Sequence, residues 1–158
     1  MPFVHPERRL RQGGKLDDFD DELPTLLEAG VGGVVSLLNI PGDARLYEEA
    51  GFKFACLPVA DGKPPSIEQV RRFVDFVNDC RSNGRAVAVH CEAGCGRTGT
   101  VICAYLIAKG DQPENAIKQV RLVEPSAIET KNQIEFLFSL PGLLASSDVP
   151  SQNRVSNQ

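Results

Sequence analysis

Short hydrophobic runs, rich in β-branched residues, alternate along the chain with stretches in which apolar residues recur at helical spacing. The runs over residues 31–38, 52–59 and 86–89 are predicted to be strands, because turn residues such as glycine bound them. Strands that alternate with helices favour parallel pairing. The pattern therefore predicts an α/β fold, a single domain whose central, mostly parallel sheet of four to five strands is flanked by helices.

Helices are predicted wherever the apolar residues recur every three or four positions. The clearest one begins after Ser66, where Gln69 completes a capping box, and it continues to the Asn83-Gly84 break. Further helices are expected over residues 22–29, 44–50, 98–109, 113–123 and 129–140. Because the chain becomes polar after residue 144, we expect one domain over residues 1–144 and a disordered tail over residues 145–158.

Composition is that of a globular protein and restricts the possible partners. Hydrophobic residues make up 42% of the chain, and the net charge of -4 gives no broadly basic surface for nucleic acid. No window approaches the roughly 18 apolar residues of a membrane span, and no secretory signal is apparent, so a cytoplasmic protein without a membrane partner is expected. Five cysteines without metal-ligand spacing indicate reduced thiols and no metal site.

The most informative segment is HCEAGCGRTG, residues 90–99, which links a predicted strand to a predicted helix. Such a loop directs several backbone N–H groups and the positive end of the helix dipole to one point, and its glycines let the backbone approach an anion closely. Arg97 adds a planar cation that can hold two phosphate oxygens. The segment therefore predicts a phosphate site, formed by Glu92, Ala93, Gly94, Cys95, Gly96 and Arg97.

Cys91 lies at the base of this loop. The helix dipole, the loop N–H groups and Arg97 all favour its thiolate over its thiol, which makes it a candidate nucleophile for phosphate transfer without a metal or cofactor. Thr98 can donate its hydroxyl to the sulfur and help it leave, although it also fits an ordinary first-turn residue of a helix. His90 either supports the loop by hydrogen bonding or serves only in packing.

Residues 90–99 resemble the His-Cys-x5-Arg-Ser/Thr loop of the protein tyrosine phosphatase superfamily, and residues 58–65, PVADGKPP, resemble the general-acid loop of its small atypical dual-specificity phosphatases. The likeness covers most of residues 8–140 and implies the cysteine-phosphatase fold and a cysteinyl-phosphate intermediate. It makes Asp61 the general acid, where the alternative is an Asp-Gly turn. It also makes Gln133 a candidate for positioning the hydrolytic water, unless Gln133 only completes a capping box with Thr130.

The same resemblance implies a substrate. Nothing before Asp61 resembles the long phosphotyrosine-recognition loop of classical tyrosine phosphatases, so we expect a monomer with a shallow pocket that accepts phosphotyrosine, and phosphoserine or phosphothreonine as well, in proteins or peptides. Phosphate and other oxyanions should inhibit it. Glu124 stands where close relatives carry arginine, which argues against acidic phosphopeptides. The absence of lysine between Cys91 and Arg97 argues against inositol lipids.

Two other functions are compatible with the sequence. The first is an RNA 5′-end or small-molecule phosphatase on the same fold, which the acidic charge disfavours. The second is a phosphate-binding module with little turnover, which is disfavoured because Cys91, Arg97 and Asp61 occur together. Cys95 and Cys56 are candidates for a protective disulfide with oxidised Cys91.

Overall fold

The computed structural model describes residues 3–4, 19–92 and 96–147. In this part of the chain, one sheet of four strands has the order β1-β4-β2-β3, and every neighbouring pair is parallel. The predicted α/β fold with a mostly parallel sheet is therefore confirmed. The strands are β1 (Phe3–Val4), β2 (Val31–Ser36), β3 (Lys53–Cys56) and β4 (Ala86–His90). β1 was not predicted, because two residues are too few to show a strand pattern.

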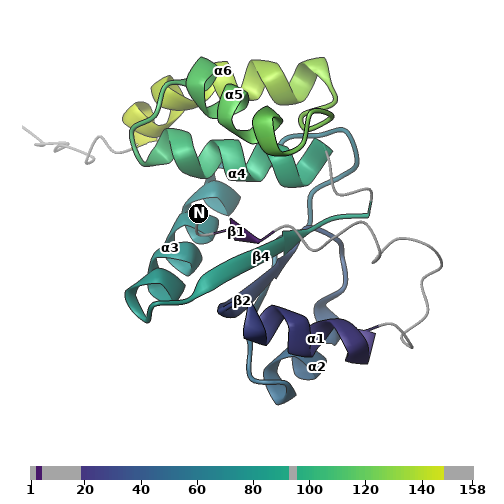
Figure 1. Ribbon diagram of the computed structural model, residues 1–158. Coiled ribbons are helices and arrows are strands. Elements are labelled where there is room, and N and C mark those ends of the chain that lie inside the picture. The colour runs from purple at the N-terminus through teal and green to yellow at the C-terminus, as the bar shows by residue number, and fades with distance from the viewer. Residues whose placement is uncertain (1–2, 5–18, 93–95, 148–158) are drawn as a thin grey trace, which may run out of the picture.

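Helices cover both faces of the sheet (Figure 1). α1 and α2 pack on one face, α3 and α4 pack on the other, and α5 and α6 lie outside α4. A short 3-10 helix, Pro41–Asp43, precedes α2. The α-helices are α1 (Phe19–Glu28), α2 (Ala44–Glu49), α3 (Ile67–Ser82), α4 (Gly96–Ala108), α5 (Pro113–Val123) and α6 (Lys131–Ser147). None of the helices in the described ranges is long and apolar enough to cross a bilayer.

The central strands are buried on both faces. In β4, Val87 and Val89 face the layer of α3 and α4, whereas Ala88 faces the layer of α1 and α2. This two-sided burial explains why β4 is a continuous apolar run with no polar alternation. In β2, a Cβ at Gly33 would lie 2.6 Å from the ring of Phe76 on α3, so the absence of a side chain lets this helix pack closely against the sheet.

Helix α6 is longer than the sequence pattern predicts. It was expected to end near Leu140, but it continues through Pro141 and Gly142 to Ser147. Leu144 packs against the apolar cluster shared by α4, α5 and α6, and this tertiary contact outweighs the low helix propensity before it. The expected tail over residues 145–158 therefore begins with three helical residues, and residues 148–158 lie outside the described part.

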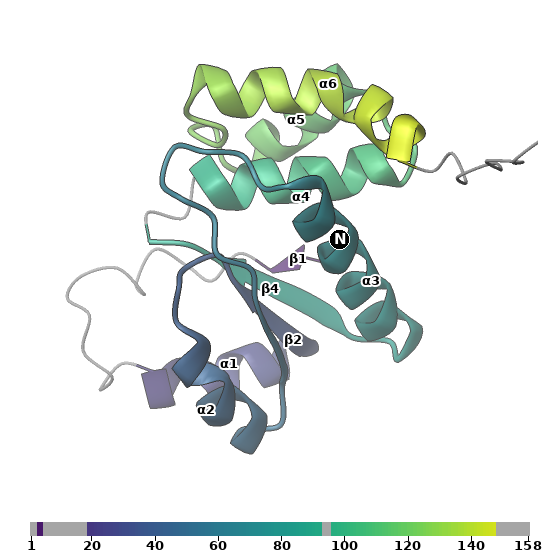
Figure 2. The ribbon, with the colours of Figure 1, turned by 180° about the vertical axis from the view of Figure 1, so that it is seen from behind.

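The parallel sheet brings two distant loops to one edge, because the carboxyl ends of β3 and β4 point the same way. β3 leads into residues 57–66, which we call the acid loop, and β4 leads through the HCEAGCGRTG segment into α4. Figure 2 shows the acid loop rising from the sheet past the first turn of α4 and the beginning of α6 before it enters α3. The acid loop and the start of α4 are thus neighbours although they are far apart in sequence.

Candidate active site

Cys91 follows β4 directly and is buried, with 9% of the residue exposed. Thr98 donates its hydroxyl hydrogen to the sulfur of Cys91 over 3.1 Å and is itself buried. Helix α4 begins at Gly96, two residues earlier than expected, so Arg97 and Thr98 both lie in its first turn. The sulfur therefore lies beside the N-terminus of a helix, where the partial positive charge favours an anion.

Arg97 connects this turn to the acid loop. Its side chain is 7% exposed, and Nη1 donates a hydrogen bond to the carbonyl of Val59 over 3.0 Å. Nε lies 3.7 Å from Oδ1 of Asp61, close enough for an ion pair but too far for a hydrogen bond. Nε is buried and has no hydrogen-bond partner among the described residues. The guanidinium thus keeps one buried donor available beside an exposed carboxylate.

The acid loop places Asp61 on a tight turn. The Lys63 N–H donates to the carbonyl of Ala60 over 3.0 Å, and Gly62 between them has φ 73, a value that few other residues adopt readily. The side chain of Gln69 donates to the carbonyl of Pro58 over 2.6 Å. Together with Arg97, Gln69 fixes the first residues of the loop. The carboxylate of Asp61, at 84% exposure, projects from the turn towards Arg97.

Gln133 is fully buried at the start of α6, with 0% exposed. Its side-chain Oε1 accepts hydrogen bonds from the backbone N–H groups of Glu129 and Thr130, at 2.9 and 3.1 Å. The backbone N–H of Gln133 donates to the Thr130 hydroxyl. The capping box is thus present. Nε2 has no hydrogen-bond partner among the described residues, and it lies 3.3 Å from the position that a Cβ on Gly96 would occupy. Gln133 therefore caps α6 and also directs a buried donor towards the first turn of α4.

The segment between α5 and α6, residues 124–130, makes contacts in the site that the sequence did not reveal. Arg121 on α5 donates to the carbonyls of Ala127 and Ile128, each over 3.0 Å. Ile128 has φ 64, which is rare for a β-branched residue. The carboxylate of Glu129 lies beside Gly96, since a Cβ there would be 3.0 Å from Oε2. In the sequence, Arg121 fits an ordinary solvated helix face, so no pattern marks these contacts.

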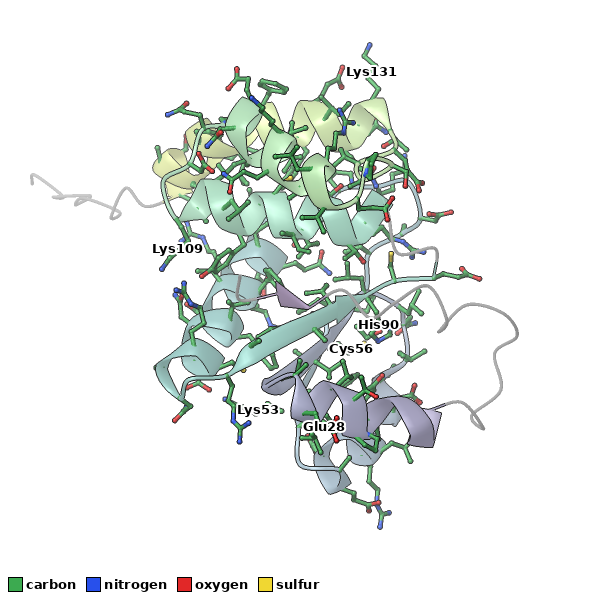
Figure 3. The ribbon with its side chains drawn as sticks, in the orientation of Figure 1. Glu28, Lys53, Cys56, His90, Lys109 and Lys131 are labelled. Atoms are coloured by element: carbon green, nitrogen blue, oxygen red, sulfur yellow. The ribbon has the colours of Figure 1, made fainter. Side chains whose placement is uncertain are left out.

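The other predicted site residues have varied surroundings. Glu92 is exposed, while Ala93, Gly94 and Cys95 lie outside the described residues. Cys56, on β3 (Figure 3), is half-buried, and its thiol donates to the carbonyl of Leu38 over 3.1 Å. The structure therefore does not place Cys95 relative to Cys91. The proposed disulfide stays a prediction.

His90 ends β4 and is labelled in Figure 3. Its Nε2 is buried and has no hydrogen-bond partner among the described residues. Burial away from water disfavours the charged imidazolium and lowers the pKa of His90 to about 4. The side chain is therefore neutral around neutral pH and supplies no positive charge to the loop that follows it.

This histidine is expected to make the protein less stable in acid. The pKa of His90 is about 4 in the folded chain and about 6.5 when unfolded, so between these values the unfolded state binds more protons and stability falls as the pH falls. At about pH 5 the loss should be about 2 kcal/mol. Urea unfolding of the native chain and of His90→Gln at about pH 7 and about pH 5 measures it. Equal losses in both proteins would contradict the assignment, since carboxylates contribute equally to each.

Comparison with known proteins decides the family. A family model described as "Polymorphic toxin system, DSP-PTPase phosphatase" matches residues 10–111, more than half of the chain. The chain belongs to the dual-specificity phosphatase family. It is 37% identical over 103 residues to human dual specificity protein phosphatase CDC14A, covering 65% of this chain and 17% of that protein. It is 36% identical over 96 residues to human dual specificity protein phosphatase 4, covering 58% of this chain and 22% of that protein. The chain thus spans a small part of the length of these curated dual-specificity phosphatases.

Solved structures agree with the expected cysteine-phosphatase fold. The structure described as "Tk-PTP in the active form" superposes with a TM-score of 0.69 at 30% sequence identity, covering 78% of this chain and 86% of that chain. Human DUSP28 superposes with a TM-score of 0.68 at 19% identity, over 92% of this chain and 93% of that chain. The likeness to DUSP28 shows a shared fold, and the two together confirm the cysteine-phosphatase fold over most of the chain.

Proposed function

We propose that this chain is a metal-independent phosphomonoester hydrolase that works through a cysteinyl-phosphate intermediate. The observation that carries the proposal is the 3.1 Å hydrogen bond from the Thr98 hydroxyl to the sulfur of Cys91, at the N-terminus of α4 and in the same turn as buried Arg97. A sulfur that receives a hydrogen bond, beside a helix N-terminus and a guanidinium, can carry negative charge and attack a phosphate. Membership in the dual-specificity phosphatase family supports the same chemistry.

In the first step, the sulfur of Cys91 attacks phosphorus, so that an S–P bond forms while the bond from phosphorus to the leaving oxygen breaks. Asp61 gives its proton to that leaving oxygen. The buried Nε of Arg97 holds the remaining phosphate oxygens, together with the N–H groups of the loop that the sequence predicts to bind phosphate, and stabilises their charge in the transition state. Nε of Arg97 and Oδ1 of Asp61 lie 3.7 Å apart, so the group that binds phosphate and the acid can both reach one substrate.

In the second step, water attacks phosphorus and gives a proton to the Asp61 carboxylate, and the S–P bond breaks to return the thiolate of Cys91 and inorganic phosphate. The Thr98 hydroxyl stabilises the departing sulfur through the hydrogen bond that it already makes. The unpartnered, buried Nε2 of Gln133 is suited to orient the attacking water, because it points towards the first turn of α4. Every group that these two steps require belongs to the chain, so no cofactor is proposed.

We infer that the substrate is a phosphorylated protein or peptide, with phosphotyrosine accepted and phosphoserine and phosphothreonine as well. The relatives named dual specificity protein phosphatases support this class. The 84% exposure of Asp61 also supports it, because an acid at the surface can serve leaving groups that project by different lengths. The catalytic domain over residues 1–144, the monomeric state and the cytoplasmic location are retained as predictions.

Trapping the intermediate tests the proposal. An aryl phosphate with radiolabelled phosphate is mixed with the native chain and a metal chelator, and the reaction is stopped within its first turnovers by acid. We expect label on the protein, mapped by peptide mass analysis to Cys91, together with steady phosphate release. Release that requires added metal, or label carried by another residue, would overturn the mechanism.

A further inference from the structure

The Thr130 side chain, in the segment between α5 and α6, reaches the turn that carries Asp61. Thr130 donates its hydroxyl hydrogen to the carbonyl of Gly62 over 2.8 Å, and the two residues are 68 positions apart in the sequence. Gly62 directly follows Asp61 and lies within the turn that the Lys63 N–H closes onto Ala60. The hydrogen bond therefore holds the turn at the residue immediately after the acid.

The geometry around Thr130 determines the direction of this hydrogen bond. The Thr130 oxygen accepts from the backbone N–H of Gln133 over 3.2 Å, and Thr130's own N–H donates to Oε1 of Gln133 over 3.1 Å. A hydroxyl has one hydrogen to donate. Since the oxygen accepts from α6, that hydrogen is available for the carbonyl of Gly62. The capping box thus holds the Thr130 side chain in the orientation that the acid loop needs.

Several contacts hold the segment that contains Thr130 in place. Arg121 binds the carbonyls of Ala127 and Ile128, and Ile128 keeps a left-handed backbone that a β-branched residue adopts only when its surroundings impose it. Ala127 also packs against the first turn of α4, where a Cβ on Gly99 would lie 2.8 Å from its own Cβ. The position of Thr130 is therefore tied to the helix that holds Arg97 and Thr98.

Among the described residues, few other contacts hold Asp61 itself. Arg97 and Gln69 bind the carbonyls of Val59 and Pro58, which precede the turn, while the carboxylate of Asp61 is exposed and forms no hydrogen bond to Nε of Arg97. We propose that Thr130 is a positioning residue, which holds the turn of the acid loop so that Asp61 faces the leaving oxygen. This inference rests on the proposed phosphatase function, in which Asp61 is the general acid.

Leaving groups that differ in their need for a proton provide the test. Dinitrophenyl phosphate releases a phenolate that needs no protonation, whereas phenyl phosphate depends on the acid. Thr130→Val removes the hydroxyl and should lower kcat/KM for phenyl phosphate about tenfold, but for dinitrophenyl phosphate less than about twofold. Thr130→Ser keeps the hydroxyl and should restore the native ratio of the two. Equal losses on both substrates would overturn the positioning role.

A double variant checks that Thr130 acts through the acid. Asp61→Asn should lower kcat/KM for phenyl phosphate by about 10²-fold or more. If Thr130 serves only to place Asp61, then adding Thr130→Val to Asp61→Asn should cause no further loss. A further tenfold loss in the double variant would show that Thr130 acts on something else and would contradict the proposal.

Thr130→Val also removes a helix cap, so a control with a comparable loss of stability is needed. Ile107 is buried in the cluster of α4, α5 and α6 towards the far end of α4, and Ile107→Val shortens it by one methyl group. Both variants should melt at somewhat lower temperature than the native chain. Only Thr130→Val should change the ratio of the two substrates, and the same change in Ile107→Val would refute a specific role.

Hydrogen exchange tests the anchor independently of catalysis. The amide of Lys63 closes the turn that Thr130 holds, so it should exchange faster in Thr130→Val than in the native chain, Thr130→Ser or Ile107→Val. If the Lys63 amide exchanges equally fast in Thr130→Val and in the native chain, Thr130 does not hold the turn, even if the chain is active. Faster exchange in a chain that hydrolyses neither aryl phosphate would support the anchor and refute the proposed function instead.

Discussion

Replacing Cys91 by serine is expected to reduce metal-free phosphate release to the uncatalysed background, a loss of at least about 10⁴-fold. The serine hydroxyl can still accept the hydrogen bond from Thr98, because the replacement is close in size and the partner is 3.1 Å away. It cannot readily become an anion near neutral pH, however, and an un-ionised hydroxyl is a poor nucleophile. Chemistry should therefore be lost while the phosphate site remains.

Two measurements separate these effects. Cys91→Ser should still be stabilised against heat by inorganic phosphate, since the loop and Arg97 are unchanged and a ligand stabilises the state that binds it. Cys56→Ser is the matched control, because the new hydroxyl can donate to the carbonyl of Leu38 as the thiol does. The control should keep native activity. Substantial phosphate release by Cys91→Ser would refute Cys91 as the nucleophile.

Replacing Arg97 by lysine is expected to lower kcat/KM for aryl phosphates by about 10³-fold, although the charge is kept. Arginine places one donor on the carbonyl of Val59 and keeps Nε buried beside Asp61, so one planar group can bind the acid loop and a phosphate at the same time. A lysine ammonium has no fork that can reach both. It either leaves the Val59 carbonyl without its donor, at a cost of about 1–3 kcal/mol, or holds the phosphate poorly.

The steady-state parameters and thermal melting of Arg97→Lys, with Arg45→Lys as control, check this prediction. Arg45 is exposed on α2, where it pairs with Glu49 at the surface, so the same exchange there should leave activity unchanged. Arg97→Lys should both lower kcat and weaken inhibition by phosphate. Near-native activity would mean that a point charge suffices and that the fork geometry is not used.

A candidate phosphate loop could be proposed from the sequence because its parts are local. Cys91, Arg97 and Thr98 lie within one strand-loop-helix unit, so their spacing alone indicates which atoms face one another. Asp61 is different, since an Asp-Gly pair is an ordinary turn signal. Only the family resemblance indicated a role for it. The parallel sheet supplies the physical reason, because β3 and β4 end at the same edge and bring the acid loop beside α4.

The hydrogen bond of Thr130 to Gly62 and the contacts of Arg121 could not be predicted, because they join segments that no local pattern relates. The capping box already accounts for Thr130 in the sequence, and its hydrogen bond to Gly62 depends on how α6 packs over α4. The extension of α6 past Pro141 likewise depends on the burial of Leu144. Local propensity predicts neither feature, because tertiary packing determines both.

The close packing of the first turn of α4 restricts how this protein can change during evolution. A side chain at Gly99 would meet Ala127 at 2.8 Å, and one at Gly96 would meet the carboxylate of Glu129 at 3.0 Å. A mutation at either glycine would push the segment of Thr130 away from the helix of Arg97. Substitutions that leave the fold intact would then still alter turnover. We therefore expect substitutions to be tolerated far more readily at the outer surfaces of α5 and α6 than in the first turn of α4.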